Sequence, residues 1–185
     1  MIKVLPRIGL FISSFFPLYV LLTISNYDDI PTLKEILEIF EFKDLNAGLF
    51  WIVILLLSII SIISLLYIVK ASLNECHSFT GVNKTEDHLL NYVVTYLLPL
   101  LSIEIHETNS LIVNAGLFLL IGYLYVKNGL VYLNPLFLFF GYNIYKADNE
   151  VILITNINFY DLKNLENEEI RCRVLSYKIY LIRKQ

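Results

Sequence analysis

The residues with the most potential for chemistry lie in a polar segment between two apolar runs. Glu75, Cys76 and His77 adjoin one another and His88 follows them, so the segment holds soft and borderline metal ligands. Zinc sites are typically marked by paired cysteines or by repeated histidine spacing, and this segment has neither. We therefore predict that it binds no metal ion.

A third histidine begins a sequence that is typical of zinc proteases. His106-Glu107 matches the start of His-Glu-x-x-His, whose two histidines hold the metal from one face of a helix. Position 110 is Ser110, so the second histidine is missing. The sequence also lacks a nucleophile triad, a phosphate-binding loop and a pair of catalytic carboxylates. We predict that the chain is not an enzyme and uses no cofactor.

Basic side chains gather at the C-terminal end. Residues 171–185 contain five of them and no acidic side chain, so they could contact anionic lipid headgroups or an acidic partner protein. The tail from Tyr142 has seven basic and six acidic residues, a net charge of only +1, which argues against direct binding of nucleic acid. A partner that extends an edge strand is the better hypothesis. The predicted partner contacts are Arg171, Arg173, Tyr177, Lys178, Arg183 and Lys184.

An uncharged run from Gly48 to Val69 dominates the sequence. As a helix it would rise about 1.5 Å per residue and cover roughly 30 Å, the thickness of the hydrocarbon core of a bilayer. Trp51 and Tyr67 lie near its two ends, and aromatic rings with a polar edge favour the membrane interfaces. The run predicts a membrane-spanning helix.

Three further apolar runs complete the predicted fold. The composition is that of a membrane protein, with 57% hydrophobic residues, 17% charged residues and a mean hydropathy of +0.64. Pro17 is expected to kink the first run, and the last run either ends at Val126 or continues with Lys127 reaching for the interface. We predict a membrane protein with an all-α four-span transmembrane bundle (residues 1–140) and a small cytoplasmic β-rich tail (residues 141–185), α+β overall. The predicted spans are residues 8–24, 48–69, 89–105 and 111–133.

The loop after the first span has a helical pattern of its own. Thr32 and Glu35 have the spacing of a capping box, and apolar residues follow on one face. Residues 32–45 are therefore predicted to form an acidic amphipathic helix outside the membrane. It either covers the ends of the spans or contacts a partner.

Basic residues set the predicted orientation. Of the 14 basic residues, 12 lie on the side of the two termini and 2 on the other side. The positive-inside rule therefore places both termini in the cytoplasm. Cys76 and Cys172 then share a reducing compartment, and both are predicted to be free thiols.

The tail has the pattern of β-structure. Tyr142–Ala147 and Glu150–Thr155 are β-prone and are joined by Asp148-Asn149, a pair that can adopt the positive φ of a hairpin turn. Residues 171–183 alternate like one half-buried strand, and a tail of this size buries too little apolar surface to be stable alone. We expect it to dock on the bundle, on a second subunit or on a partner. The predicted buried face of the last strand is formed by Leu175, Tyr177, Ile179 and Leu181.

Two stretches of the sequence resemble the KwaA family, the membrane subunit of the bacterial Kiwa anti-phage system. They are residues 91–99, NYVVTYLLP, and residues 134–145, NPLFLFFGYNIY. The order of apolar runs and the short polar tail are also similar to that family. The matching positions, which are typical of structural roles, are Asn91, Thr95, Tyr96, Pro99, Asn134, Pro135 and Gly141.

This resemblance implies a multi-pass protein of the bacterial inner membrane. Such a protein would form a homo-oligomer, with a tetramer as one candidate assembly, and would contact membrane lipids and a cytosolic KwaB-like partner protein. The membrane subunit would sense infection and anchor this DNA-binding effector without contacting nucleic acid itself.

Two other functions remain open. One is a small oligomeric channel or pore, for which Ser58, Ser61 and Ser64 give the only support because they repeat every third residue along the second span. Close packing of helices explains the same stripe and is the favoured interpretation. The other function is a membrane scaffold or immunity protein without a sensing role.

Overall fold

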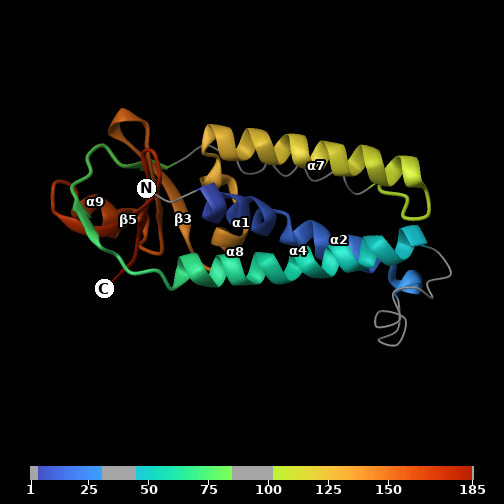
Figure 1. Ribbon diagram of the computed structural model, residues 1–185. Coiled ribbons are helices and arrows are strands. Elements are labelled where there is room, and N and C mark those ends of the chain that lie inside the picture. The colour runs from blue at the N-terminus through green and yellow to red at the C-terminus, as the bar shows by residue number, and fades with distance from the viewer. Residues whose placement is uncertain (1–3, 31–44, 85–101, 185) are drawn as a thin grey trace.

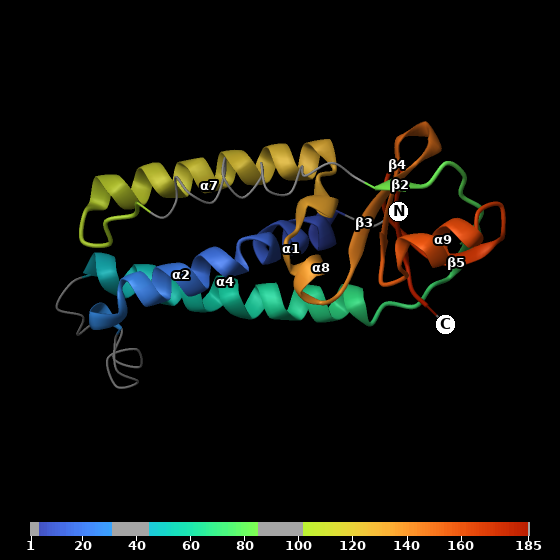
Figure 2. The ribbon, with the colours of Figure 1, turned by 180° about the vertical axis from the view of Figure 1, so that it is seen from behind.

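The computed structural model describes residues 4–30, 45–84 and 102–184 of the chain. An elongated helical part carries a β-sheet at one of its ends (Figure 1). The N-terminal end of the first helix lies at the sheet, and the other two long helices run toward it, as the reverse view also shows (Figure 2).

The first helical segment is broken in the middle. Helix α1 (Val4–Ser14) and helix α2 (Phe16–Ser25) meet at Phe15 with a bend of 40°. Pro17 lies in the first turn of α2, where a missing N–H costs no helical hydrogen bond. The predicted kink is thus confirmed, and a short 3-10 turn, η1 (Tyr27–Asp29), follows.

Two long helices lie beside this bent segment. Helix α4 (Leu45–Val69) has 25 residues and helix α7 (Thr108–Asn128) has 21. Gly129 ends α7 because it adopts the left-handed conformation (φ 66°) that closes many helices. By length and composition, α4 and α7 could each cross a membrane, and the bent pair would make a third crossing if it acts as one span.

The predicted all-α four-span bundle is wrong. Among the described residues only two helices are single spans by length and composition, and a six-stranded mixed sheet forms a large part of the fold. The fourth predicted span ends at Asn128 and not at residue 133, because the chain turns at Gly129. Of the two predicted ends, Val126 is therefore close to the observed one and residue 133 is wrong. Hydropathy could not choose between them, since the residues after Gly129 are as apolar as those before it.

Two of the predicted helices fall mainly on residues that the structure does not describe. The predicted third span, residues 89–105, is described only from Ser102 onward, and that part contains no helix. The predicted amphipathic helix, residues 32–45, lies outside the described residues except for Leu45, which begins α4.

Small residues bring the helices into close contact. A Cβ atom added to Gly9 of α1 would lie 2.4 Å from Oγ of Ser64, and one added to Gly122 of α7 would lie 2.7 Å from a ring carbon of Phe11. Ser61 of α4 is buried, and its hydroxyl lies between two acceptors, the carbonyl oxygen of Leu57 on its own helix at 2.7 Å and that of Ile12 on α1 at 3.2 Å. Ser61 and Ser64 therefore lie where α4 packs against α1, as the favoured interpretation of close helix packing predicted.

The sheet draws its strands from two separate parts of the chain. Its order is β1-β5-β6-β4-β3-β2, and only the central pair β4 and β6 is parallel. Helix α9 (Phe159–Asn164) lies between β4 and β5 in the sequence. The strands are β1 (Glu75–His77), β2 (Asn83–Lys84), β3 (Asn143–Ala147), β4 (Val151–Thr155), β5 (Ile170–Ser176) and β6 (Ile179–Ile182).

Both edge strands come from the loop after α4 and not from the C-terminal tail. Strand β1 pairs with β5, and β2 pairs with β3, so the loop holds the tail at both edges. This pairing explains how a tail too small to be stable alone becomes part of a larger core. One face of the sheet packs with the helical part through residues such as Ile154 and Leu181, while the other face covers a second core around Leu153 and Cys172.

Two hairpins lie within the tail. The predicted turn between β3 and β4 is present as η4 (Asp148–Glu150), with the positive φ angles at Asn149 and Glu150, one residue later than expected. The second hairpin corrects a prediction, because residues 171–183 form two strands, β5 and β6, and not one. The chain reverses at Tyr177 and Lys178, so Tyr177 is 77% exposed and does not join the predicted buried face.

Candidate functional site

The sheet is joined to α4 through two arginine side chains. The Arg183 guanidinium, just after β6, donates to the carbonyl oxygen of Ala71, which follows the last turn of α4. The Arg173 guanidinium, on β5, lies 5.8 Å from the centre of the Tyr67 ring. A cation near the last carbonyl groups of a helix is favourable because the helix dipole is negative there. Both contacts hold the sheet against the end of the helix.

A buried asparagine, Asn134, joins the segment between α7 and β3 to helix α1. After α7 the chain forms two short turns, η3 (Val131–Leu133) and α8 (Leu136–Phe139), and Asn134 lies between them with no exposed surface. Its Nδ2 atom donates to Oγ of Ser13 at 2.6 Å and to the carbonyl oxygen of Leu10 at 3.2 Å. Its Oδ1 atom accepts from the Leu136 N–H at 2.9 Å. All of its hydrogen-bonding groups are therefore used inside the core.

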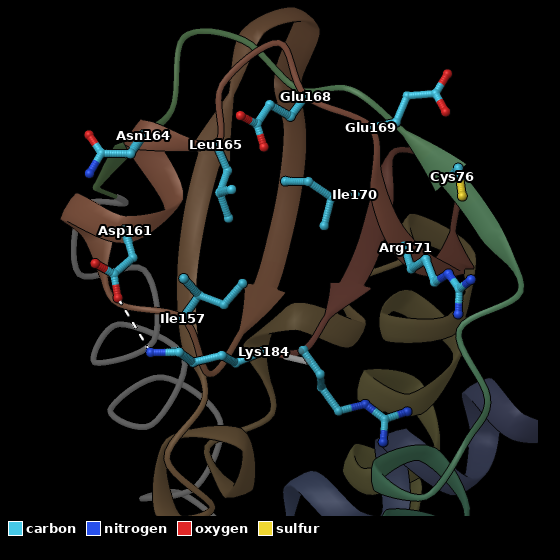
Figure 3. Close-up of a pocket in the computed structure, with 11 residues that line it drawn as sticks. Cys76, Ile157, Asp161, Asn164, Leu165, Glu168, Glu169, Ile170, Arg171 and Lys184 are labelled. Carbon is cyan, nitrogen blue, oxygen red and sulfur yellow. Dashed lines mark ion pairs between the residues drawn. The ribbon is translucent and has the colours of Figure 1, made fainter.

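A cavity of about 600 Å³ opens on the sheet beside α9 (Figure 3). Ile157, Leu165 and Ile170 lie in its middle, between charged side chains at its rim. The charges are balanced, so the cavity suits a polar partner with groups of both signs. Its acidic residues are Asp161, Glu168 and Glu169, and its basic residues are Arg171, Arg183 and Lys184.

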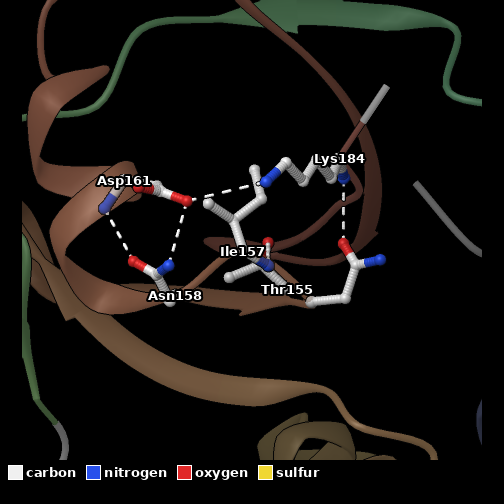
Figure 4. A network of polar contacts seen from close by, with 6 residues as sticks. Thr155, Ile157, Asn158, Asp161 and Lys184 are labelled. Carbon is white, nitrogen blue, oxygen red and sulfur yellow. Dashed lines mark hydrogen bonds and ion pairs between the residues drawn. The ribbon is translucent and has the colours of Figure 1, made fainter.

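A local hydrogen-bond network shapes one side of this cavity (Figure 4). Asn158 caps α9, because its Oδ1 accepts from the Asp161 N–H at 2.8 Å. The Asp161 carboxylate accepts from Nδ2 of Asn158 at 2.9 Å and lies 3.7 Å from the Lys184 ammonium. The Lys184 N–H donates to Oδ1 of Asn156 at 2.8 Å, which holds the end of the chain beside the cavity.

The two cysteines lie in different surroundings. Cys76 is exposed at the cavity, whereas Cys172 is buried with no exposed surface. Burial, with smaller effects from Glu75 and Cys76, raises the pKa of the Cys172 thiol from 9.0 to about 11. Cys172 is therefore a protonated core residue near neutral pH and a poor nucleophile.

The residues that suggested metal chemistry are not brought together. His77 lies 3.4 Å from Glu75, its neighbour on β1, and His106 lies 3.6 Å from Asp29 at the far end of the helical part. Within residues 4–30, 45–84 and 102–184, no three potential ligands are placed to hold a metal ion. His88 lies outside the described residues.

The six predicted partner contacts separate into three locations. Arg171, Arg183 and Lys184 line the cavity, while Arg173 faces α4 at Tyr67. Tyr177 and Lys178 form the turn between β5 and β6, where the Lys178 ammonium lies 5.5 Å from the centre of the Tyr177 ring. The fold therefore distributes the six predicted contacts over the cavity, the contact with α4 and a turn.

The positions that resemble the KwaA family are described in part. Asn134 and Pro135 are buried, and Gly141 has a φ of 75°, which few other residues adopt without strain. These positions turn the chain from α7 into β3. Asn91, Thr95, Tyr96 and Pro99 lie outside the described residues.

Two features of this region were not predicted from the sequence, namely the acidic half of the cavity and the carbonyl group that accepts the hydrogen bond of Arg183. Asp161, Glu168 and Glu169 come from a loop that was treated only as a polar connection. No hairpin was predicted in residues 171–183, and for that reason the position of this loop beside Cys76 of β1 was not expected. Ala71 carried no signal, because it acts through its backbone carbonyl group.

A family model described as "Anti-phage protein KwaA" matches residues 6–181, nearly the whole chain. No curated protein and no solved structure matches the chain.

Proposed function

Since this chain belongs to the KwaA family of anti-phage proteins, we propose that it senses phage infection at the bacterial inner membrane and anchors a cytosolic effector there. The effector would be the KwaB-like partner protein that the resemblance implies, and the membrane subunit would act as a homo-oligomer. The observation that carries this proposal is that apolar helices and a sheet with a charged cavity share one hydrophobic core.

The outer surface of the helices supports placement in a membrane. Large apolar side chains are exposed along α4 and α7, among them Ile59, Ile63 and Leu119. In water so large an exposed apolar surface would be unfavourable, whereas in a membrane the same side chains contact lipid tails that are equally apolar. Tyr67 and Tyr123 lie near the sheet ends of these helices, each beside a cation, as is typical of membrane interfaces.

The sheet would then lie in the cytoplasm. The N-terminal end of α1 and the C-terminal ends of α4 and α7 all lie at the sheet (Figure 2). The segments at this end hold most of the basic residues, which the positive-inside rule assigns to the cytoplasmic side. A partner that binds the cavity would therefore be held close to the inner face of the membrane.

Neutralising the acidic rim of the cavity tests the proposed partner site. The full-length protein is produced with the KwaB-like protein and purified in detergent, and the amount of partner that remains bound is measured. We expect Glu168→Gln with Glu169→Gln to lower partner retention about fivefold, because each exposed charge contributes up to about 1 kcal/mol. Protection against phage, measured as plaque number, should fall in parallel.

The matched control is Glu104→Gln with Glu107→Gln, which removes two exposed glutamates at the other end of the helical part. Partner retention and membrane association should stay at the wild-type level in this control. If the control pair and the cavity pair lower partner retention equally, the cavity is not the partner site. Recovery of the full-length protein in the aqueous fraction without detergent would contradict the membrane placement.

A further inference from the structure

A groove of about 540 Å³ lies where α4 ends beneath the sheet. Ile63, Leu66 and Tyr67 line it from the last turns of α4, Lys70 and Ser72 follow, and Arg173 completes it from β5. Two segments that are distant in the sequence thus place a lysine and an arginine on the same groove. It is separate from the cavity assigned to the partner protein, which none of these six residues lines.

The groove changes from apolar to basic along its length. Ile63, Leu66 and Tyr67 are 61%, 45% and 57% exposed, so their side chains are available to an apolar ligand. Lys70 is exposed one turn after Leu66. A ligand that follows the groove would meet alkyl side chains first, then an aromatic ring, and then two cations.

Neither cation is paired with a carboxylate in the described part of the chain, and the Arg173 contact with the Tyr67 ring leaves its positive charge unneutralised. The groove is lined by no carboxylate, and no ion pair joins Lys70 or Arg173 to a described acidic residue. The carbonyl group of Ala71 at the end of α4 already accepts from Arg183, so Lys70 and Arg173 are not needed there. The groove therefore carries a local charge of +2, which favours an anion.

We propose that this groove binds an anionic phospholipid of the cytoplasmic leaflet. The phosphate lies between Lys70 and Arg173, the Ser72 hydroxyl is positioned to donate to it, and an acyl chain follows Leu66 and Ile63. This inference rests on the proposed placement of α4 in the membrane. A free phosphate ion would use only the basic end of the groove, whereas a phospholipid uses its apolar end as well.

Lipid binding here would act on the sheet directly. Arg173 belongs to β5, the strand that also carries Arg171 at the partner cavity. A change in the headgroup beside Arg173 would therefore alter the contacts of a strand that reaches the partner site. This places a lipid-dependent contact between the membrane and the proposed effector site.

Native mass spectrometry of the full-length protein in detergent tests the proposal with two probes, phosphatidylglycerol and phosphatidylcholine. The wild-type protein should bind phosphatidylglycerol more tightly. Lys70→Gln with Arg173→Gln should weaken that binding by about tenfold or more, since each basic residue near anionic lipid contributes about a fivefold change in affinity. The pair Lys146→Gln with Lys163→Gln removes two exposed lysines that line neither the groove nor the partner cavity, and it should change this binding less than twofold.

Two further measurements separate the possible failures. Carbonate extraction reports whether the protein is in the membrane, and partner retention reports the proposed function. If the protein is membrane-bound and Lys70→Gln with Arg173→Gln still binds phosphatidylglycerol as the wild type does, this inference is wrong and the proposed function stands. Full competition by millimolar inorganic phosphate would also overturn it, because the site would then take the ion and not the lipid. Lys70→Arg should retain binding, which distinguishes loss of charge from loss of folding.

Discussion

The guanidinium of Arg183 donates a hydrogen bond to the carbonyl oxygen of Ala71, across 112 positions of the sequence. This contact joins the last strand of the sheet to the end of α4, and β1 begins four residues after Ala71. The two chain segments that build the sheet thus meet at the point where the helix leaves the proposed membrane.

Replacing Arg183 should loosen the sheet from α4. We expect Arg183→Ala to lower the free energy of unfolding by about 1–3 kcal/mol, because it removes a charged donor and leaves the Ala71 carbonyl group without that partner. Trypsin should then cleave more rapidly after Lys70, which is exposed beside this contact. The control is Lys184→Ala, which loses only a solvent-exposed ion pair with Asp161 and should cost at most about 1 kcal/mol. Equal cleavage rates in the two variants would show that the Arg183 contact does not hold the sheet.

Replacing Asn134 should destabilise the junction between α1 and the turn after α7. Asn134→Leu removes two donated hydrogen bonds and leaves the Leu136 N–H without its acceptor in the core. We expect a loss of about 1–3 kcal/mol for that unsatisfied group, measured by thermal unfolding in detergent. The same substitution at Asn114 should be nearly neutral, because the described partner of its amide is Ser110, one turn earlier on the same helix. A neutral Asn134→Leu would contradict the role of this side chain in the junction.

Two glycines of α7 should respond in opposite ways to alanine. A Cβ atom at Gly122 would meet the Phe11 ring at 2.7 Å, and that ring is held by the neighbouring Phe118 ring at 4.9 Å. Gly122→Ala should therefore cost about 1–3 kcal/mol from overpacking. Among the described residues, no atom lies within 4 Å of a Cβ atom added to Gly116, so Gly116→Ala should stabilise the helix by about 0.5–1 kcal/mol. The two variants are compared by thermal unfolding in detergent. Shifts of the unfolding temperature with the same sign in both would contradict the close approach of α1 and α7.

The two cysteines should differ in their reaction with a maleimide. Cys76 is exposed and should be labelled in the native protein, whereas Cys172 is buried and should be labelled only after unfolding. Mass spectrometry should therefore find one label per chain in detergent and two after denaturation. Native labelling of Cys172 would contradict its position in the core.

Cys172 should also make the protein less stable at alkaline pH. The pKa of this thiol is raised from 9.0 to about 11 in the folded protein, so folding favours the protonated form. Its contribution to stability is fully present below about pH 9 and is lost as pH rises toward 11, because the unfolded chain loses the proton first. Cys172→Ala should remove this part of the pH dependence, measured by unfolding between pH 8 and 11, and an unchanged slope would contradict the shift.

Much of the helical part could be predicted from the sequence because its signals are local. The uncharged run from Gly48 to Val69 predicted α4, Pro17 predicted the bend, and the serine spacing predicted close packing of α4 against another helix. Each of these depends on residues within one or two helical turns. The resemblance to the KwaA family was also correct, and the family match covers residues 6–181.

The sequence by itself determined that α4 and α7 are apolar helices, where the first helical segment bends, and that the tail contains β-structure. Only the tertiary structure decided that the support comes from β1 and β2, that residues 171–183 form a hairpin, and that Arg173 and Arg183 turn toward α4. The reason is physical. Strand pairing and the contacts of a long basic side chain depend on which distant segments meet, and short polar strands such as β2 have no periodicity from which a partner could be inferred.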